Sequence, residues 1–176
     1  FYDHKKKGAA RNFIDAITPE MVSSCVLVLQ DDAEILIENY ELIQFLDDDR
    51  LLDAYEHGHM TIISLFTHGY PESDDIIVVD TSPEKRVMSC NGGCAFMLGM
   101  DERCELLNWA AEHPDALDQP LPQMIGQFCY ETGCNYWITG KNACRHIGEV
   151  STIEGRPEWF RYPDIRRETC NSEQQN

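Results

Sequence analysis

The sequence predicts an α+β domain: an antiparallel sheet of about four strands, packed with helices and cross-linked by disulfides. Its β-rich runs follow one another and do not alternate with helices as strand–helix–strand units do. A helical pattern with an acidic first turn spans residues 101–113. Eight cysteines occur in 176 residues, seven of them from Cys90 to Cys170, a density typical of domains held by disulfides.

The first residues predict a helix, a helical turn and a strand. Residues 9–17 can form a short helix. Thr18, Pro19 and Glu20 supply an N-cap, a first-turn proline and a favourable acidic residue, which indicates another helical turn. Residues 25–29, Cys-Val-Leu-Val-Leu, predict a buried strand.

A turn, a return strand and a helix are expected next. Residues 30–33 favour a turn, and residues 34–37 favour a strand. Helical spacing then dominates from near Asn39. This helix should end by Gly58, which can take the left-handed conformation found at helix C-termini.

The middle of the chain predicts a hairpin and a further strand. Residues 60–66 and 76–79 are β-rich, and the segment between them holds Gly69, Pro71 and Ser73. Residues 86–89 predict another strand before a Gly-Gly turn.

The last third predicts two helices and an irregular region. Pro114 should stop the helix of residues 101–113. Residues 121–130 predict a second helix, whereas residues 134–170 are rich in glycine and proline and predict loops and short strands tied by cysteines.

The cysteines predict four disulfides, because their number is even and their spacings do not repeat. The cysteines concerned are Cys25, Cys90, Cys94, Cys104, Cys129, Cys134, Cys144 and Cys170. Structural zinc is the alternative, with Cys90, Cys94, Cys129 and Cys134 as ligands, but both pairs are spaced more widely than the usual C-x2-C. A redox-active pair is disfavoured because no C-x-x-C occurs.

Charge narrows the choice of partners. The 31 acidic side chains outnumber the 14 basic ones, giving a net charge of −17, which argues against nucleic acid and anionic membranes. No apolar run is long enough to span a bilayer. We expect protein, glycan or small-molecule partners and a monomeric state.

The chain start and the cysteines together predict a secreted protein in its mature form. It begins at Phe1 and shows no signal-peptide pattern. We expect a basic arm over residues 1–8, one disulfide-stabilised domain over residues 9–170 and a polar tail over residues 171–176. Lys85-Arg86 is either a strand-edge pair or a processing site.

Catalytic signals are weak. His57, His59 and His68 lie near carboxylates and could support acid–base hydrolysis or metal binding. No G-x-S-x-G, H-E-x-x-H or P-loop motif accompanies them, so exposed turn histidines are the favoured interpretation. The acidic runs at residues 31–32, 47–49 and 74–75 lack EF-hand spacing and predict solvated turns. No metal and no cofactor is expected.

Aromatic and arginine side chains crowd the end of the chain. Such residues form binding hot spots, although for Trp137 and Trp159 taken individually core filling is the favoured role. The residues concerned are Tyr130, Tyr136, Trp137, Trp159, Phe160, Arg161, Tyr162, Arg166 and Arg167.

The segment Pro157-Glu158-Trp159, followed by Arg161, Arg166 and a closing Cys170, resembles the C-terminal end of the LARS family, which are secreted avirulence effectors of plant-pathogenic fungi. In Trp159-Phe160-Arg161-Tyr162 the arginine stands one place later than in the family's tryptophan–arginine motif. The resemblance implies a four-stranded antiparallel sheet backed by helices and pinned by disulfides. It also implies a virulence protein without catalytic activity, acting in the apoplast, with entry into the host cell left open.

The sequence therefore favours a secreted effector that binds a host plant protein or immune receptor, or masks another effector. The expected binding residues are Trp159, Arg161, Tyr162 and Arg166. The alternative is a secreted hydrolase that uses His57, His59 or His68 with a nearby carboxylate. A structural or toxin-like secreted protein is a third class.

Overall fold

The computed structural model describes residues 8–17, 25–30, 33–36, 58–66, 76–90, 95–140 and 143–146. Within these ranges the chain forms helices, a 3-10 helix and strands. In chain order they are α1 (Ala9–Ala16), β1 (Cys25–Leu29), β2 (Ala33–Ile35), β3 (Thr61–Ser64), β4 (Ile77–Val78), α4 (Pro83–Ser89), β5 (Ala95–Gly99), α5 (Met100–Glu112), η1 (Pro114–Asp118), α6 (Leu121–Thr132), β6 (Asn135–Ile138) and β7 (Cys144–His146).

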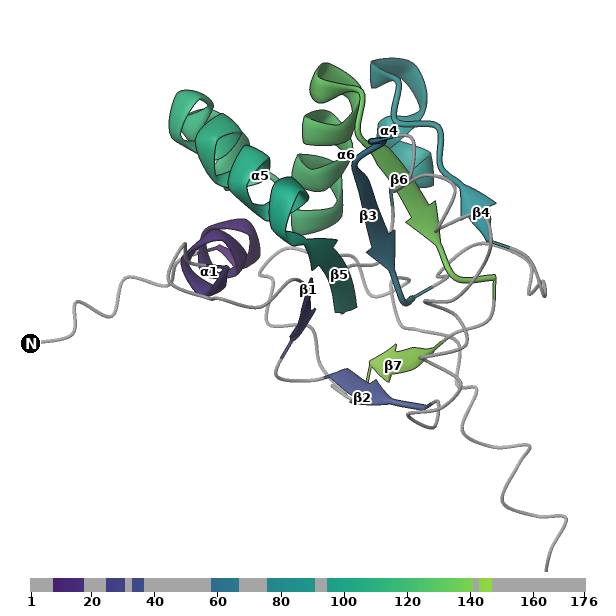
Figure 1. The fold of residues 1–176 in the computed structure, drawn as a ribbon. Coiled ribbons are helices and arrows are strands. Elements are labelled where there is room, and N and C mark those ends of the chain that lie inside the picture. Colours follow the sequence, from purple (N-terminus) through teal and green to yellow (C-terminus); the bar gives the residue numbers. More distant parts are fainter. Residues whose placement is uncertain are drawn as a thin grey trace, which may run out of the picture.

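The main sheet has five strands in the order β1-β5-β3-β6-β4 (Figure 1). β5 pairs antiparallel with both β1 and β3. β3 and β6 pair in parallel, with Thr61 opposite Asn135, and β4 closes the sheet antiparallel to β6. A separate ribbon of two strands, β2 and β7, lies beyond one end of this sheet (Figure 1). The architecture is therefore α+β with a mixed sheet.

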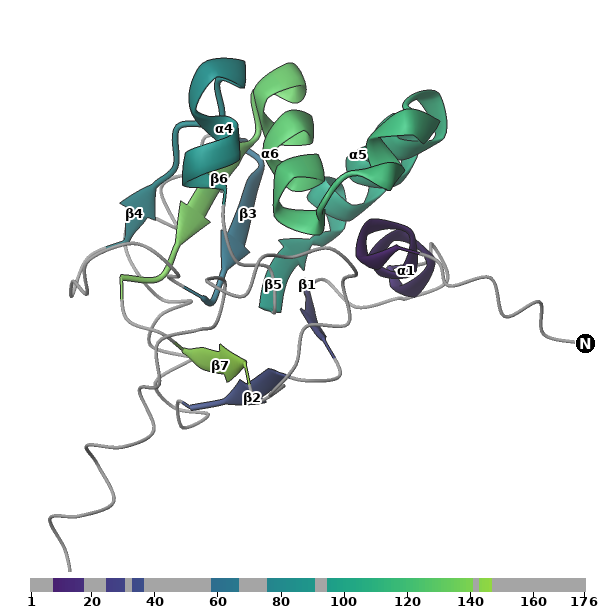
Figure 2. The ribbon, with the colours of Figure 1, turned by 180° about the vertical axis from the view of Figure 1, so that it is seen from behind.

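One face of the main sheet packs against the helices. The two opposite views of the ribbon both show the helices grouped on this face (Figure 2). Alternate strand residues point into this core, as the two-residue period of a strand requires. They include Ile62, Phe96, Leu98, Tyr136 and Ile138, all at most 1% exposed. Phe13 of α1 meets Phe96 edge to face, with ring centroids 5.7 Å apart.

The opposite face packs a second core. The intervening residues of the same strands lie in it, among them Ile63, Met97 and Trp137, together with Ala143 and Cys144 at the start of β7. β3 and β5 are buried along their whole length, because both faces of the sheet are covered. Strands buried on both faces lose the alternation of apolar and polar residues, which makes them hard to recognise in a sequence.

The sheet corrects two sequence-based expectations. It is mixed and not antiparallel. Residues 60–66 and 76–79 do not form a hairpin, because β6 lies between β3 and β4. The turn-forming residues between the two segments indicated a local pairing. The structure instead places a strand from far along the chain between them, which no local signal reveals.

Two local predictions were also wrong. Residues 86–89, expected as a strand, belong to helix α4, which begins at Pro83 after the N-cap residue Ser82. β5 was not predicted, because Ala-Phe-Met-Leu-Gly is a short apolar run without alternation.

Other elements confirm their predictions. α1, β1, α5 and α6 lie within three residues of the expected bounds. Gly58 has a φ of 69°, the left-handed conformation expected of it. The helix predicted to precede Gly58 lies outside the described residues, as do the turn at residues 18–20 and the tail from residue 147 onward.

The predicted disulfides are not found among the described cysteines. No two of Cys25, Cys90, Cys104, Cys129, Cys134 and Cys144 are joined by a disulfide, while Cys94 and Cys170 lie outside the described residues. Burial in the two apolar cores, and not cross-linking, accounts for Cys90, Cys129, Cys134 and Cys144. Within the described part of the chain, no helix combines the length and apolarity that crossing a bilayer needs.

Candidate functional site

Three strands of the main sheet end at the same edge. β1 and β3 both run antiparallel to β5, so they share one direction, and β6 runs parallel to β3. Their last residues are Leu29, Ser64 and Ile138. In sheets that contain parallel strands, ligands commonly bind beyond the carboxyl ends of those strands. We call this edge the carboxyl edge.

The β2–β7 ribbon is anchored to the carboxyl edge by backbone hydrogen bonds. The carbonyl of Leu65, just after β3, accepts the backbone N–H groups of Ala143 and Cys144 at 3.0 and 3.2 Å. The Cys144 thiol also lies 3.4 Å from this carbonyl oxygen. Leu36 donates its N–H to the Ala143 carbonyl at 2.9 Å. The strands β3 and β6 point toward the ribbon (Figure 1).

A short acidic segment joins β1 to the ribbon. The N–H of Ala33 donates to the carbonyl of Gln30 at 3.0 Å, and in the sequence only Asp31 and Asp32 stand between these residues. Both aspartates lie outside the described residues. In the ribbon, Ala33 is the register partner of His146, and Glu34 is the partner of Arg145. His146 thus lies opposite Ala33, the residue that follows the aspartate pair in the sequence.

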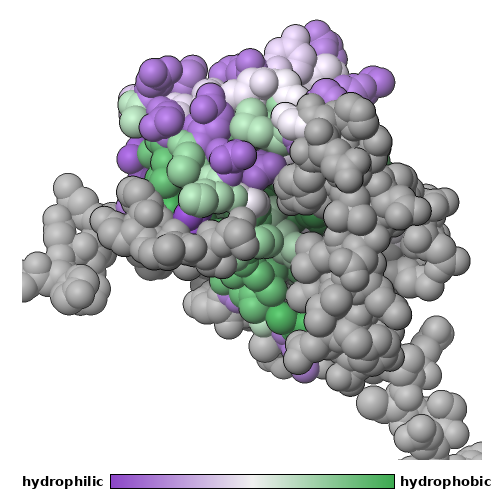
Figure 3. All heavy atoms as spheres, viewed as in Figure 1, coloured by the Kyte–Doolittle hydropathy of each residue, from purple (hydrophilic) through white to green (hydrophobic). Residues whose placement is uncertain are grey.

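Apolar side chains flank this acidic segment. Leu29, Ile35 and Leu36 are 39, 40 and 46% exposed, although large apolar residues are normally buried. Figure 3, in the orientation of Figure 1, shows hydrophobic side chains in the lower part of this face and hydrophilic ones over the helices above. The carboxyl edge therefore has an accessible apolar surface on either side, in the sequence, of the aspartate pair.

The amino edge of the sheet has a different character. Glu102, in the first turn of α5, is 2% exposed and accepts the backbone N–H of Thr61 at 2.8 Å. Partial burial of the Cys25 thiol, and then the nearby Glu102 charge, raise the pKa of Cys25. These contacts join α5 to the start of β3 and serve the fold.

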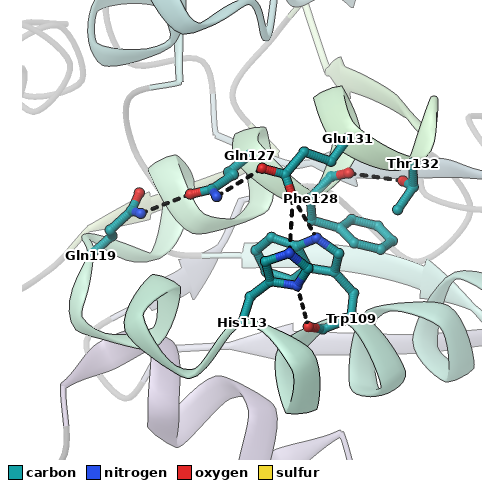
Figure 4. A network of polar contacts seen from close by, with 7 residues as sticks. All are labelled: Trp109, His113, Gln119, Gln127, Phe128, Glu131 and Thr132. Carbon is teal, nitrogen blue, oxygen red and sulfur yellow. Dashed lines mark hydrogen bonds and ion pairs between the residues drawn. The ribbon is translucent and has the colours of Figure 1, made fainter.

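A polar network joins α5 to α6 (Figure 4). The indole N–H of Trp109 donates to Glu131 Oε2 at 2.8 Å, and Gln127 donates to Glu131 Oε1 at 2.9 Å. Gln119 donates in turn to Gln127 at 2.8 Å. Burial acts to raise the pKa of Glu131, but the hydrogen bonds from Gln127 and Trp109 outweigh it, so the pKa is lowered.

The predicted site residues fall mostly outside the described part of the chain. This holds for Trp159, Arg161, Tyr162 and Arg166, and also for His57 and His68. His59 is described and exposed, just before the amino end of β3. It is therefore not at the carboxyl edge.

The buried thiols are poor ligands and nucleophiles. Burial raises the pKa of Cys90 to about 12 and that of Cys129 well above its usual value. Within the described ranges, no three side chains of His, Cys, Asp or Glu are grouped to hold a metal ion. The zinc alternative, which needs Cys90, Cys129 and Cys134 together with Cys94, finds no support in these residues.

The acidic segment next to the carboxyl edge was not predicted as a functional site from the sequence. Asp31 and Asp32 were predicted to form a solvated turn, and His146 was not singled out. The available signal was their position: the aspartates directly follow an apolar strand, where polar residues gather in ligand-binding sheets. The pairing of β2 with β7, which brings His146 to the same place, has no local sequence signal.

Comparison with known protein families finds no matching family model, and comparison with curated proteins finds no significant match. The function must therefore be argued from the site itself.

Proposed function

We propose that this protein is a group-transfer enzyme that binds a phosphate-activated donor, together with a divalent cation, at the carboxyl edge of its main sheet. One observation carries the proposal: the ribbon that holds Ala33 opposite His146 is hydrogen-bonded through Leu65 to the edge where β1, β3 and β6 end. The covalent neighbours of Ala33 and Gln30 at this edge are Asp32 and Asp31.

The donor set suits a hard divalent cation. Mg²⁺ prefers oxygen ligands, and proteins commonly bind it with one or two carboxylates while substrate phosphates complete its coordination. Mn²⁺ accepts carboxylate ligands equally well, and imidazole suits several first-row metals. Asp31, Asp32 and His146 would be the residues that hold the ion.

Net charge supports a role for a cation. A chain with a net charge of −17 repels a diphosphate, and a bound divalent ion offsets that repulsion where the phosphates sit. When bound, such an ion stabilises negative charge on a departing oxygen.

The absence of a phosphate-binding loop narrows the class of donor. Phosphoryl-transfer enzymes of the P-loop type hold the phosphates with a glycine-rich loop and a lysine, and the sequence has no such motif. If the leaving group is a diphosphate bound to the cation, the protein does not need a glycine-rich loop and a lysine to hold the phosphates. We therefore propose a nucleoside diphosphate that carries the transferred group, with a nucleotide sugar as the simplest example.

Calorimetric titration tests the proposal. We expect Mn²⁺ to bind the full chain and uridine or guanosine diphosphate to bind only in its presence. Asp31→Asn and Asp32→Asn should each weaken Mn²⁺ binding by about tenfold or more. Asp115→Asn, which removes an exposed charge from η1, is the matched control and should leave binding unchanged. The proposal fails if Mn²⁺ does not bind, or if the control weakens binding as much as the edge variants.

A turnover assay completes the test. The full chain should release nucleoside diphosphate from at least one nucleotide sugar in the presence of Mn²⁺ or Mg²⁺, and chelation should abolish the release. If the protein bound the diphosphate but turned over no donor in a broad panel, it would be a nucleotide-binding protein and not a group-transfer enzyme.

The proposal differs from the sequence-based expectation of no catalysis and no metal. That expectation, the secreted effector with a host partner, and the hydrolase that uses His57, His59 or His68 all stay predictions. The expectation of secretion rested on disulfides, and none is found between the six described cysteines, which removes most of that support.

A further inference from the structure

The contact between His113 and Glu131 depends on the protonation of the histidine. His113 Nδ1 lies 2.8 Å from the backbone carbonyl oxygen of Trp109. A carbonyl can only accept, so Nδ1 carries the proton and donates it. In a neutral ring Nε2 is then a lone-pair acceptor, yet it faces Glu131 Oε2 at 3.5 Å. Two acceptors meet in the neutral state, whereas in the imidazolium Nε2 also donates.

The surroundings of His113 favour the charged ring in other ways. The ring stacks on Trp109 with centroids 4.5 Å apart and planes inclined by 15°, and an indole face attracts a cation. His113 also directly follows the last residue of α5, where the helix dipole favours positive charge. Figure 4 shows the imidazole lying against the indole, with Glu131 above both.

The Glu131 carboxylate is held in place independently of His113. Trp109 and Gln127 each donate to one of its oxygens. The charge of Arg86 on α4 also acts on the Glu131 carboxyl. The partner of the histidine is thus fixed and ionised across the neutral pH range.

Glu112 of α5 and Asp115 of η1 lie close to His113 in the chain and are exposed. Arg11 of α1 donates to the Pro114 carbonyl and to Asp118.

We propose that Trp109, His113 and Glu131 form a proton-dependent tie between α5 and α6, which strengthens when His113 becomes protonated. The tie fixes the corner from which α6 leads through the left-handed Gly133 into β6. The pH range in which the tie is present has an upper and a lower limit. It weakens as pH rises through the range in which imidazole loses its proton, and it is also lost in acid, where Glu131 gains a proton.

NMR titration of the His113 ring and thermal unfolding together test the tie. The wild-type ring signals locate the pH at which the ring changes charge. In Glu131→Gln the loss of melting temperature relative to the wild type should be larger at about pH 5.5 than at about pH 8, because only the charged ring donates to the carboxylate. An equal loss at both pH values in a folded Glu131→Gln protein overturns the proposal.

Thermal unfolding of a second variant keeps the proposal testable if Glu131→Gln does not fold. His113→Gln should lower the melting temperature more at about pH 5.5 than at about pH 8, on either side of the usual histidine pKa. His59→Gln, at the exposed described histidine outside the cluster, should show no such difference. An equal loss at both pH values for His113→Gln contradicts the tie.

Discussion

Gly126 in α6 and Cys90 at the end of α4 approach so closely that a Cβ on Gly126 would stand 2.6 Å from the Cys90 sulfur. The same Cβ would lie 3.1 Å from two side-chain carbons of Arg86. The absent side chain at Gly126 therefore lets α4 pack directly on α6, above the helix-covered face of the sheet.

Gly126→Ala should lower the free energy of unfolding by about 1–3 kcal/mol, because overpacking forces the sulfur or a helix to shift. Alanine is favoured over glycine in a helix by roughly 1 kcal/mol, so a net loss means that the clash exceeds this gain. Urea unfolding monitored by circular dichroism measures the change.

The control for this prediction removes the sulfur. In a Cys90→Ala background, Gly126→Ala should cost less than in the wild type, since only the 3.1 Å contacts with the Arg86 side chain then oppose the gain in helix propensity. Equal costs in both backgrounds would show that the sulfur contact does not limit the packing of α4 on α6.

Glu102→Ala should destabilise the protein by about 1–3 kcal/mol, because it leaves the buried N–H of Thr61 without its acceptor. Glu102→Gln keeps an oxygen at this position and should cost less. The difference between the two variants in urea unfolding isolates the hydrogen bond from the loss of side-chain volume. Equal costs would mean that packing, and not the bond to Thr61, sets the role of Glu102.

Gly99 limits the position of the Glu102 carboxylate. A Cβ on Gly99 would clash with Glu102 Oε2, so Gly99→Ala should push the carboxylate away and destabilise the protein by about 1–3 kcal/mol. In a Glu102→Ala background the same substitution should cost little. Additive losses would instead place the two residues in separate interactions.

The parts of the fold that the sequence predicted well are those fixed by local signals. α5 carries an acidic first turn and ends before Pro114, and α6 ends at Gly133 with a φ of 74°. β1 was predicted to the residue, since its apolar run is bounded by polar residues on both sides.

Apart from the local errors at α4 and β5, the failures concern long-range pairing. β6 lies between β3 and β4, although about 60 or more residues separate it from each in the sequence. The ribbon likewise joins Ala33 to His146. Because Asp31 and Asp32 gain a candidate partner only through this pairing, the sequence alone predicted a solvated turn. The cysteine count led to the wrong prediction of disulfides for a related reason. A buried thiol and a disulfide both appear in the sequence as cysteine, and only the three-dimensional packing distinguishes the two.

The stability contribution of Asp80 should depend on pH. A hydrogen bond from Lys85, and then the bonds from Ser82, lower the pKa of Asp80, with the Lys85 Nζ 2.8 Å from Asp80 Oδ2. The stabilisation is complete above the usual aspartate pKa of about 3.9 and is lost as pH falls toward the lower folded-state value. The melting temperatures of wild type and Asp80→Asn should therefore differ at neutral pH and converge in acid.

The matched control for Asp80 is Glu84→Gln, which removes one exposed negative charge from the first turn of α4, four residues further along the chain. Its difference from the wild type should not follow the Asp80 profile. A constant difference between Asp80→Asn and wild type from neutral pH down to about pH 2 would exclude the ion pair as the cause.

Native alkylation should divide the described cysteines by exposure and thiol pKa. Cys104 is exposed and should react fastest with iodoacetamide at about pH 8, because the thiolate is the nucleophile. Cys25 is also exposed, but its raised pKa should slow it. Cys90 and Cys129, both 1% exposed and with raised pKa values, should react only after unfolding.

Peptide mass spectrometry after timed alkylation, with and without prior reduction, checks this order. Without reduction, all six described cysteines should become alkylated once the protein is unfolded, because no disulfide joins any two of them. A disulfide found among them in protein purified from an oxidising medium would contradict this arrangement and restore the argument for secretion. Equal native rates for Cys104 and Cys129 would instead show that α6 opens readily, because a buried thiol can react only from an open state.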